Sequence, residues 1–205
     1  MYIPSAFAET NPDTLHEFME HHSFATMISV DGNQVVTTQV PLLLDRANQQ
    51  LLGHVARANP HGQLLDGRPI TCLFHGPHAY ISPTWIAVRN SVPTWNYVTV
   101  EVRGTVRLEP DPDRCLDILR TTVDTYESSL PVPWSIDMPE PEFIEKLVAA
   151  IVAFRIDIEQ IEGKWKLNQN HDAVRRQRVI AALQAGGAID QLEIAGLMQA
   201  TLPSE

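Results

Sequence analysis

The chain has 205 residues, which suits one large domain or a domain with an appendage, and a core of that size needs no disulfide or metal staple. Its formal net charge of -10, from 15 Lys and Arg against 25 Asp and Glu, works against non-specific DNA binding, which requires an excess of basic residues. The start of the sequence does not have the pattern of a signal peptide, and no apolar run approaches the ~20 residues of a membrane span, so we predict neither. Cys72 and Cys115 have no metal or redox spacing, and we predict buried thiols in a reducing cytoplasm.

The N-terminal third predicts a helix followed by a small set of strands. Asn11 is the predicted cap of the helix, with Pro12 at its first position. Alternating apolar residues predict strands over 24–30, 34–40 and 50–55, and Asp31-Gly32-Asn33 is a hairpin turn between the first two. Asn59-Pro60 begins a short helix that is predicted to end near Gly67.

The stretch 70–104 predicts two or three strands around a tight corner, because apolar residues recur at every second position. Gly76-Pro77 is predicted to break the first strand, and Ser82-Pro83 to end the second. Side chains that both stack and hydrogen-bond are unusually dense here, so the stretch suits a flat heterocyclic ligand. They are His75, His78, Tyr80, Trp85, Trp95, Asn96 and Tyr97.

The second half predicts helices around one further strand. Asp111-Pro112 begins a long helix, and a proline-rich connection over 130–141 leads to a helix over 143–150. A strand over 152–158 follows, and two helices over 172–184 and 190–200 end the chain. The residues predicted to be buried on the long helix are Ile118, Leu119, Val123 and Tyr126.

Strands joined by short hairpins, with helices inserted and then appended, predict an α+β, mainly β, antiparallel barrel or sandwich. We predict a sheet domain over 1–170 and a C-terminal helical tail over 171–205.

The segment GHVARANP, residues 53–60, is a candidate phosphate site. A strand ends there, Arg57 projects, and a helix begins after Asn59, so a guanidinium and free backbone N–H groups lie close together. An ordinary strand-to-helix junction with an exposed arginine is the competing and more common interpretation.

The segment GKWKLNQN, residues 163–170, is interpreted as a polar loop, and loops often carry binding groups. Lys164 or Lys166 is suited to a phosphate there, and Gln169 or Asn170 to the edge of a ring. A solvated connector to the tail is the alternative.

In VPTWNY, residues 92–97, Trp95 is placed to cover a flat ring and Asn96 to hydrogen-bond it. A lone tryptophan is more often a core residue with its N–H satisfied, so this interpretation competes with a structural one.

Other chemistry is weakly indicated. The histidines lack a zinc spacing, which leaves a metal site as the minor alternative, and neither a Ser-His-Asp order nor a P-loop is present. The run Arg175-Arg176-Gln177-Arg178 is predicted to be the solvated face of a helix, with nucleic-acid contact as the less common alternative. That helix is predicted to bury Val174, Val179, Ile180 and Leu183.

Five strings, in this order and spacing, resemble the FMN-binding negative transcriptional regulator family of the PaiB type, from Met1 into the helical tail: MYIPSAF, GHVARANPH, FHGPHAYISPTW, VPTWNY and GKWKLNQN. The resemblance implies an FMN-binding split barrel of antiparallel Greek-key type, similar to the pyridoxamine-phosphate oxidase group, that forms a homodimer with FMN at the subunit interface. It also implies repression of genes for sporulation and degradative enzymes, or a general flavin-linked regulatory role.

Within that resemblance we assign Arg57 and Asn59 to the phosphate of FMN, with Lys166 as reinforcement from either subunit. Asn168 stands where the resemblance leads us to expect a serine before the glutamine, and an asparagine can make similar hydrogen bonds. The residues assigned to the ring or the ribityl chain are His54, Ser82, Trp95, Asn96 and Gln169.

Three functions remain open on the sequence. They are a dimeric FMN-binding regulator in the cytoplasm, a flavin-dependent oxidoreductase on the same barrel, and a structural or haem-binding barrel without flavin. Direct DNA binding has weak support, because the net charge is negative and the last helix carries Asp190 and Glu193 but no Lys or Arg.

Overall fold

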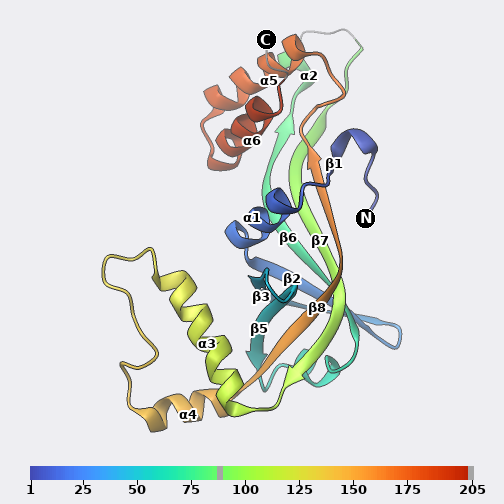
Figure 1. Cartoon of the computed structure of the whole chain (residues 1–205). Helices are drawn as coiled ribbons and strands as arrows, with labels where there is room; N and C mark the ends of the chain where they lie inside the picture. Colours follow the sequence, from blue (N-terminus) through green and yellow to red (C-terminus); the bar gives the residue numbers. More distant parts are fainter. Residues whose placement is uncertain (87–89, 203–205) are drawn as a thin grey trace. The chain divides into compact units, whose positions relative to one another are not determined.

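The structure is a computed structural model that describes residues 1–86 and 90–202 (Figure 1). The strands are β1 (Ala8–Glu9), β2 (Phe24–Asp31), β3 (Gln34–Pro41), β4 (Leu43–Asp45), β5 (Gln50–Ala56), β6 (Pro69–Ile81), β7 (Thr94–Glu109) and β8 (Ile151–Lys166). The α-helices are α1 (Pro12–His21), α2 (Pro83–Ile86), α3 (Pro112–Glu127), α4 (Pro141–Ala149), α5 (Ala173–Gly186) and α6 (Ile189–Ala200). Two 3-10 helices are η1 (Ser5–Phe7) and η2 (Pro60–Leu64).

The strands form a sheet in the order β3-β2-β6-β7-β8-β5-β4, with β1 paired to β8. The protein divides into two compact units, which we describe separately. Unit 1 comprises Met1–Phe18, His75–Glu101 and Glu162–Glu205, and unit 2 comprises Met19–Phe74 and Val102–Ile161. The predicted division at residue 170 into a sheet domain and a helical tail stays a prediction.

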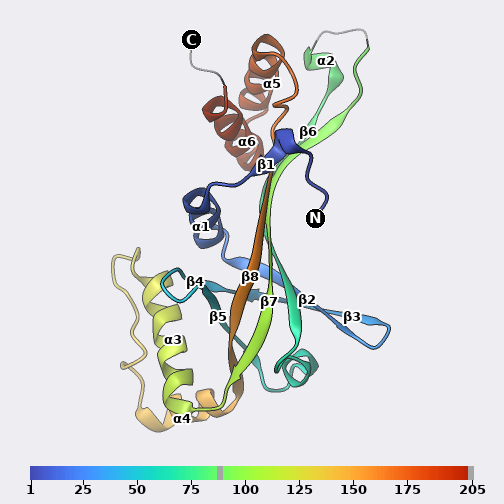
Figure 2. The ribbon, with the colours of Figure 1, turned by 45° about the vertical axis from the view of Figure 1, so that its right-hand side comes forward.

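In unit 2, β2 and β3 form the predicted hairpin, which extends away from α3 in Figure 2. Asp31 pairs with Gln34, so the turn consists of Gly32 and Asn33. Gly32 has a φ of 59°, and a glycine at the first central position is typical of a type II′ turn, whose twist matches the strands.

The core of unit 2 lies along β5 and β8 and extends to α3. Leu51, Phe154 and Ile156 are fully buried, and Cys115 and Ile118 of α3 pack on Ala153. Asp111 caps α3 as predicted, accepting from the backbone N–H of Asp113. The burial predicted for Tyr126 is wrong, because this side chain is 43% exposed. Its hydroxyl lies 2.6 Å from Ser23 Oγ, which gives the polar end a partner.

Both cysteines are buried free thiols, as predicted. Burial raises the pKa of the Cys72 thiol to about 12, because the thiolate would lose its hydration. The Cys115 thiol donates to the Glu109 carbonyl at 3.1 Å.

The break predicted at Gly76-Pro77 is wrong, because β6 runs unbroken through it. The buried positions of β6 change there from Cys72 and Phe74 to Pro77 and Ala79, so the pair marks a change of buried face. Gly76 is required for a close approach instead. A Cβ at this position would lie 2.7 Å from the Phe18 ring, within unit 1.

The polar loop predicted for residues 163–170 is partly wrong, because Gly163 to Lys166 form the end of β8. Gly163, Lys164 and Trp165 are buried. In unit 1, Gly163 pairs with Glu9 of β1, and the Trp165 ring meets the Phe18 ring edge-on with centroids 5.1 Å apart. Strand pairing and aromatic packing therefore order a segment whose composition indicates a loop.

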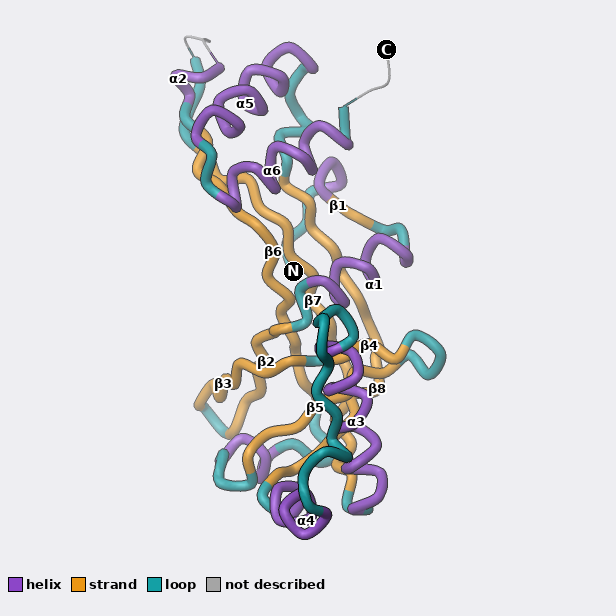
Figure 3. The backbone as a smooth tube through the Cα atoms, turned by 90° about the vertical axis from the view of Figure 1, so that its left-hand side faces the viewer, coloured by secondary structure: helices purple, strands orange, loops and turns teal. Residues whose placement is uncertain are grey.

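The α5–α6 pair of unit 1 confirms the two predicted terminal helices, which lie side by side in Figure 3. Gly187 ends α5 with a φ of 73°, as a left-handed cap requires. The prediction that the basic run of α5 is solvated is wrong at Arg176. This side chain is buried and donates to the carbonyls of Met198 and Thr201 at the end of α6. Val174 was predicted to be buried and is 58% exposed, whereas Val179, Ile180 and Leu183 are buried.

Over the described ranges, no helix is both long enough and apolar enough to cross a membrane.

Candidate functional site

The junction between β5 and η2 in unit 2 has the predicted cap. Asn59 Oδ1 accepts from the backbone N–H of His61 at 3.0 Å, and Pro60 is the first helical residue. The helix is of the 3-10 type and ends at Leu64, shorter than the predicted end near Gly67.

Arg57 follows β5 directly, and its guanidinium binds the end of α4. Its Nε donates to the Ala149 carbonyl at 2.7 Å and its Nη2 to the Ile151 carbonyl at 2.6 Å. These bonds satisfy backbone carbonyls at the negative end of the α4 dipole. They fix the plane of the guanidinium through Nε and Nη2. In the described residues Nη1 has no hydrogen-bond acceptor, so its two hydrogens can bind a further one.

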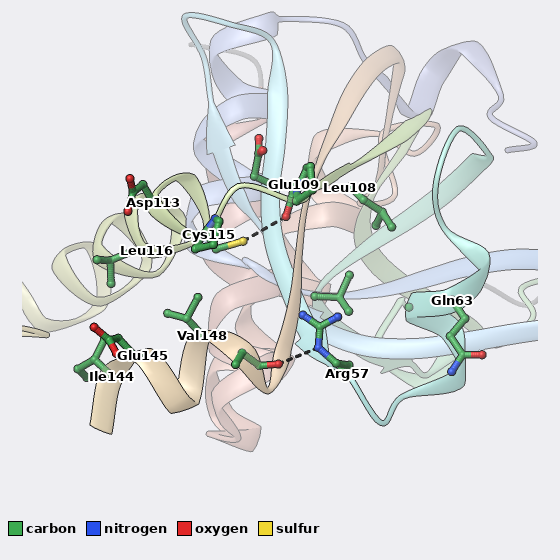
Figure 4. Close-up of a pocket in the computed structure, with 15 residues that line it drawn as sticks. Arg57, Gln63, Leu108, Glu109, Asp113, Cys115, Leu116, Ile144, Glu145 and Val148 are labelled. Atoms are coloured by element: carbon green, nitrogen blue, oxygen red, sulfur yellow. Dashed lines mark hydrogen bonds between the residues drawn. The ribbon is translucent and has the colours of Figure 1, made fainter. Parts of the chain in front are cut away.

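Arg57 also lines a cavity of about 800 Å³ in unit 2, shown in Figure 4. The volume lies within the range of small-molecule sites. Its walls come from η2, the end of β7 and the helices α3 and α4, and they are mainly apolar. The apolar residues include Leu108, Leu116, Ile144, Val148 and Val152.

Carboxylates also line this cavity, at Glu109, Asp113 and Glu145. Glu109 is neutralised by Arg155, whose Nη1 lies 2.8 Å from its carboxylate. The Asp113 and Glu145 carboxylates are exposed, so water screens their repulsion of an anion near Arg57. The cavity therefore suits an apolar ligand body, and Arg57 is its cationic group.

His61 forms the polar centre of this junction. Its Nε2 lies 2.8 Å from Ser29 Oγ and its Nδ1 2.9 Å from Thr38 Oγ1, so one buried imidazole links β2, β3 and η2. Asn59 Nδ2 donates to the same Thr38 hydroxyl at 3.3 Å. The network fixes the Asn59 cap, and burial lowers the pKa of His61 because the charged form would lose hydration.

We expect the His61 network to make the protein sensitive to mild acid. The folded pKa is below the unfolded value of about 6.5, so the unfolded chain takes up a proton that the folded chain does not. Stability from this group is fully present above pH ~6.5 and is lost as the pH falls below it. The free energy of unfolding in urea at pH 8, 6.5 and 5 should show a shallower acid loss for His61→Gln than for the unaltered chain. Equal slopes would contradict this role.

His54 lies on β5, paired with Ala153 of β8. It is half-buried, and burial lowers the pKa of its imidazole as well. In the described structure it lies among the strands of unit 2 rather than in the cavity wall.

In unit 1, Trp95 lies in an exposed aromatic group with His78 and Tyr80. Its ring centroid is 5.8 Å from that of Tyr80, at a near-perpendicular angle, and 6.0 Å from that of His78. Trp95 is 52% exposed and Tyr80 46%, so flat aromatic surface is open to solvent. Such a surface suits the stacking that was predicted for Trp95.

Lys166 and Gln169 are held close to the backbone of unit 1. Lys166 Nζ donates to Thr94 Oγ1 and to the Trp95 carbonyl, both at 2.5 Å. The Gln169 amide is used locally, since its Oε1 accepts from Leu167 N and its Nε2 donates to the Trp165 carbonyl. The chain turns between Trp165 and Gln169, and Asn168 adopts the left-handed backbone conformation there, with a φ of 60°.

Ser82 and Asn96 have structural contacts in unit 1. Ser82 Oγ lies 2.7 Å from Thr84 Oγ1 and also accepts from the Thr84 backbone N–H, at the start of α2. Asn96 is fully buried, with Nδ2 3.3 Å from Met198 Sδ and no hydrogen-bond partner for Oδ1 in the described residues. Asn96 is therefore closed to solvent and to a ligand in this structure.

His54, Arg57 and Asn59 thus lie in unit 2, where only Arg57 lines the cavity, and the other five predicted residues lie in unit 1. Their roles toward a flavin stay predictions. The sequence-based FMN assignment includes neither His61 nor Tyr97, and of the two lysines that suit a phosphate it includes only Lys166. Alternation along a strand would have put the two lysines on one face, but the segment was interpreted as a loop. Within the two described ranges, no cluster of three or more potential metal ligands occurs.

The model of a family described as a putative FMN-binding domain matches residues 1–160 of the chain. "Protease synthase and sporulation protein PAI 2" of Bacillus subtilis is 30% identical over 208 residues, which cover 100% of both chains. An uncharacterized protein of Aspergillus fumigatus is 24% identical over 91% of this chain and 92% of its own.

Two solved structures share the fold. The FAD and heme binding protein from Mycobacterium smegmatis has a TM-score of 0.60 at 16% identity, over 88% of this chain and 80% of its own. The flavocytochrome Anf3 from Azotobacter vinelandii has a TM-score of 0.58 at 15% identity, over 78% of this chain and 69% of its own. With the antiparallel strand order, these likenesses confirm the predicted fold class, a mainly β split barrel with inserted helices.

Proposed function

Because this chain belongs to the putative FMN-binding domain family, we propose that it is an FMN-binding transcriptional regulator that acts as a homodimer in the cytoplasm. FMN is the cofactor of the family. The observation that carries the regulatory role is the full-length similarity to a protein named for protease synthesis and sporulation.

The geometry supports flavin binding in two respects. Arg57 has a fixed guanidinium with one nitrogen still available, as a phosphate ligand requires. Trp95 presents an exposed ring that can cover one face of an isoalloxazine. The exposed aromatic group of His78, Tyr80 and Trp95 also supports a homodimer, because contiguous apolar surface commonly marks an interface.

Regulation at the DNA itself would require a basic face. In the described part of the chain α6 carries no Lys or Arg, and Arg176 of α5 is buried. We therefore propose that a dimer responding to flavin controls transcription with a local basic patch or an additional partner, and the retention of DNA at moderate salt tests which of them applies.

The test is a titration of the purified protein with FMN, followed by the flavin absorption spectrum and by light scattering after size exclusion. We expect binding at micromolar FMN and twice the chain mass of 22.9 kDa. Absence of binding would remove the proposal. Steady oxidation of a nicotinamide cofactor without DNA retention would favour the oxidoreductase instead.

Trp95→Ala should weaken FMN and riboflavin alike, by roughly two- to tenfold, because both contain the ring that it stacks on. Trp134→Ala is the matched control, since Trp134 is 41% exposed in the connection between α3 and α4. Equal effects of the two substitutions would contradict a stacking role for Trp95.

A further inference from the structure

Two lysine ammonium groups of unit 1 converge on one aromatic ring. Lys164 and Lys166 are two residues apart on β8, so their side chains leave the same face of the strand, with Cα atoms about 7 Å apart. Lys164 Nζ lies 5.2 Å from the centre of the Tyr97 ring, and Lys166 Nζ lies 6.0 Å from it. Both ammonium groups therefore lie within cation–π range of the Tyr97 ring.

The neighbours of these ammonium groups are neutral oxygens. Lys164 Nζ donates to the Tyr2 carbonyl at 3.1 Å, and Lys166 Nζ donates to the Thr94 hydroxyl and the Trp95 carbonyl. The Met1 ammonium binds the carboxylates of Glu101 and Glu162, at 3.3 and 2.7 Å. Within residues 1–86 and 90–202, neither lysine forms an ion pair with a carboxylate.

Burial disfavours a positive charge that has no ion-pair partner. Lys164 is only 8% exposed, and a buried ammonium is normally paired with an anion. Burial lowers the pKa of Lys166, and the positive charge of Lys164 lowers it further. An anion between the two nitrogens would relieve both effects.

The Lys166 end of the pair is open to solvent. Lys166 and Thr94 are half-buried, and the adjacent Trp95 is 52% exposed. Each ammonium has three N–H donors, and its protein contacts are one for Lys164 and two for Lys166. Donors thus remain on both nitrogens.

We infer that Lys164 and Lys166 form a binding site for the phosphate group of a small ligand. A phosphate monoester carries close to two negative charges near neutral pH, which balance two ammonium groups, and lysine commonly binds phosphate as a point charge. The inference goes beyond the proposed function, because it holds for the phosphate of FMN and equally for a second phosphorylated molecule.

The lysines of the chain are Lys146, Lys164 and Lys166, so lysine labelled with ¹³C gives few NMR signals to follow. The probe is inorganic phosphate, titrated into flavin-free protein against sodium chloride of equal ionic strength. We expect the Cε signals of Lys164 and Lys166 to shift with one common saturation curve and the pKa of Lys166 to rise. Lys146 lies exposed on α4, and its signal serves as the internal control.

Lys166→Met should lower phosphate affinity at least tenfold, Lys166→Arg should retain most of it, and Lys146→Met should leave it unchanged. The titration of the unaltered chain needs no variant, so a variant that fails to fold does not affect the test. Absence of any phosphate-specific shift of Lys164 and Lys166 would overturn the inference, as would an equal shift of Lys146.

Addition of FMN then separates the two sources of phosphate. Displacement of inorganic phosphate by FMN, but not by riboflavin, would identify the site as the phosphate end of the flavin. Simultaneous binding of both would identify a second phosphorylated ligand. Phosphate binding without any FMN binding would remove the proposed function and leave the lysine site intact.

Discussion

Replacing Arg57 by alanine is expected to weaken FMN binding about ten- to hundredfold and to affect riboflavin much less, because only FMN carries the phosphate. The carbonyls of Ala149 and Ile151 hold the guanidinium in one orientation. A preorganised donor loses little entropy when a ligand binds, so its removal costs the full charge-assisted hydrogen bond.

The measurement is a pair of titrations, FMN and riboflavin, on the same protein preparation. The substitution also removes two hydrogen bonds to the end of α4, so thermal unfolding of the variant must be followed separately. Arg68→Ala is the control, since Arg68 forms an exposed ion pair with Asp31, and such pairs contribute little. Equal weakening of FMN and riboflavin would leave Arg57 with a structural role only.

Gly104→Val is expected to lower the free energy of unfolding by roughly 3 kcal/mol or more, the largest effect on stability that we predict. Gly104 lies on β7 within unit 2, where a Cβ would collide with the Asp157 carbonyl oxygen and lie 2.9 Å from Ile156 Cγ2. The first of these atoms belongs to the backbone of β8, which cannot move away by a change of rotamer. Strands β7 and β8 must therefore separate locally, which weakens the hydrogen bonds between them.

Urea denaturation monitored by tryptophan fluorescence gives the comparison. Gly196→Ala is the matched glycine control, because Gly196 lies inside α6 and its new methyl group meets no described atom within 4 Å apart from the adjacent residues and backbone of the helix itself. Alanine favours a helix over glycine, so this control should raise stability by about 0.5–1 kcal/mol. A change of less than about 1 kcal/mol for Gly104→Val would show that β7 and β8 lie farther apart than the structure places them.

Sequence reasoning placed correctly those residues whose structure depends on neighbours only a few positions away in the chain. Asn11 and Asp111 cap helices because each side chain reaches a backbone N–H two residues later. The Asp31-Gly32-Asn33 turn needs only one residue with a positive φ. The residues placed badly depend on distant partners. Arg176 lies in a charged run, but the carbonyls at the end of α6 provide hydrogen bonds that make its burial favourable.

The sequence by itself determined the antiparallel elements, the family and its cofactor FMN, because capping, alternation and ordered motifs are encoded by neighbouring residues. Only the tertiary structure decided which charged side chains are bound by other groups of the protein and which have no ion-pair partner among the described residues. Arg57 binds carbonyls some 92 positions away, and Lys164 and Lys166 share the ring of Tyr97 without a carboxylate in the described residues. Desolvation and charge pairing arise when remote segments pack together, so no local pattern specifies them.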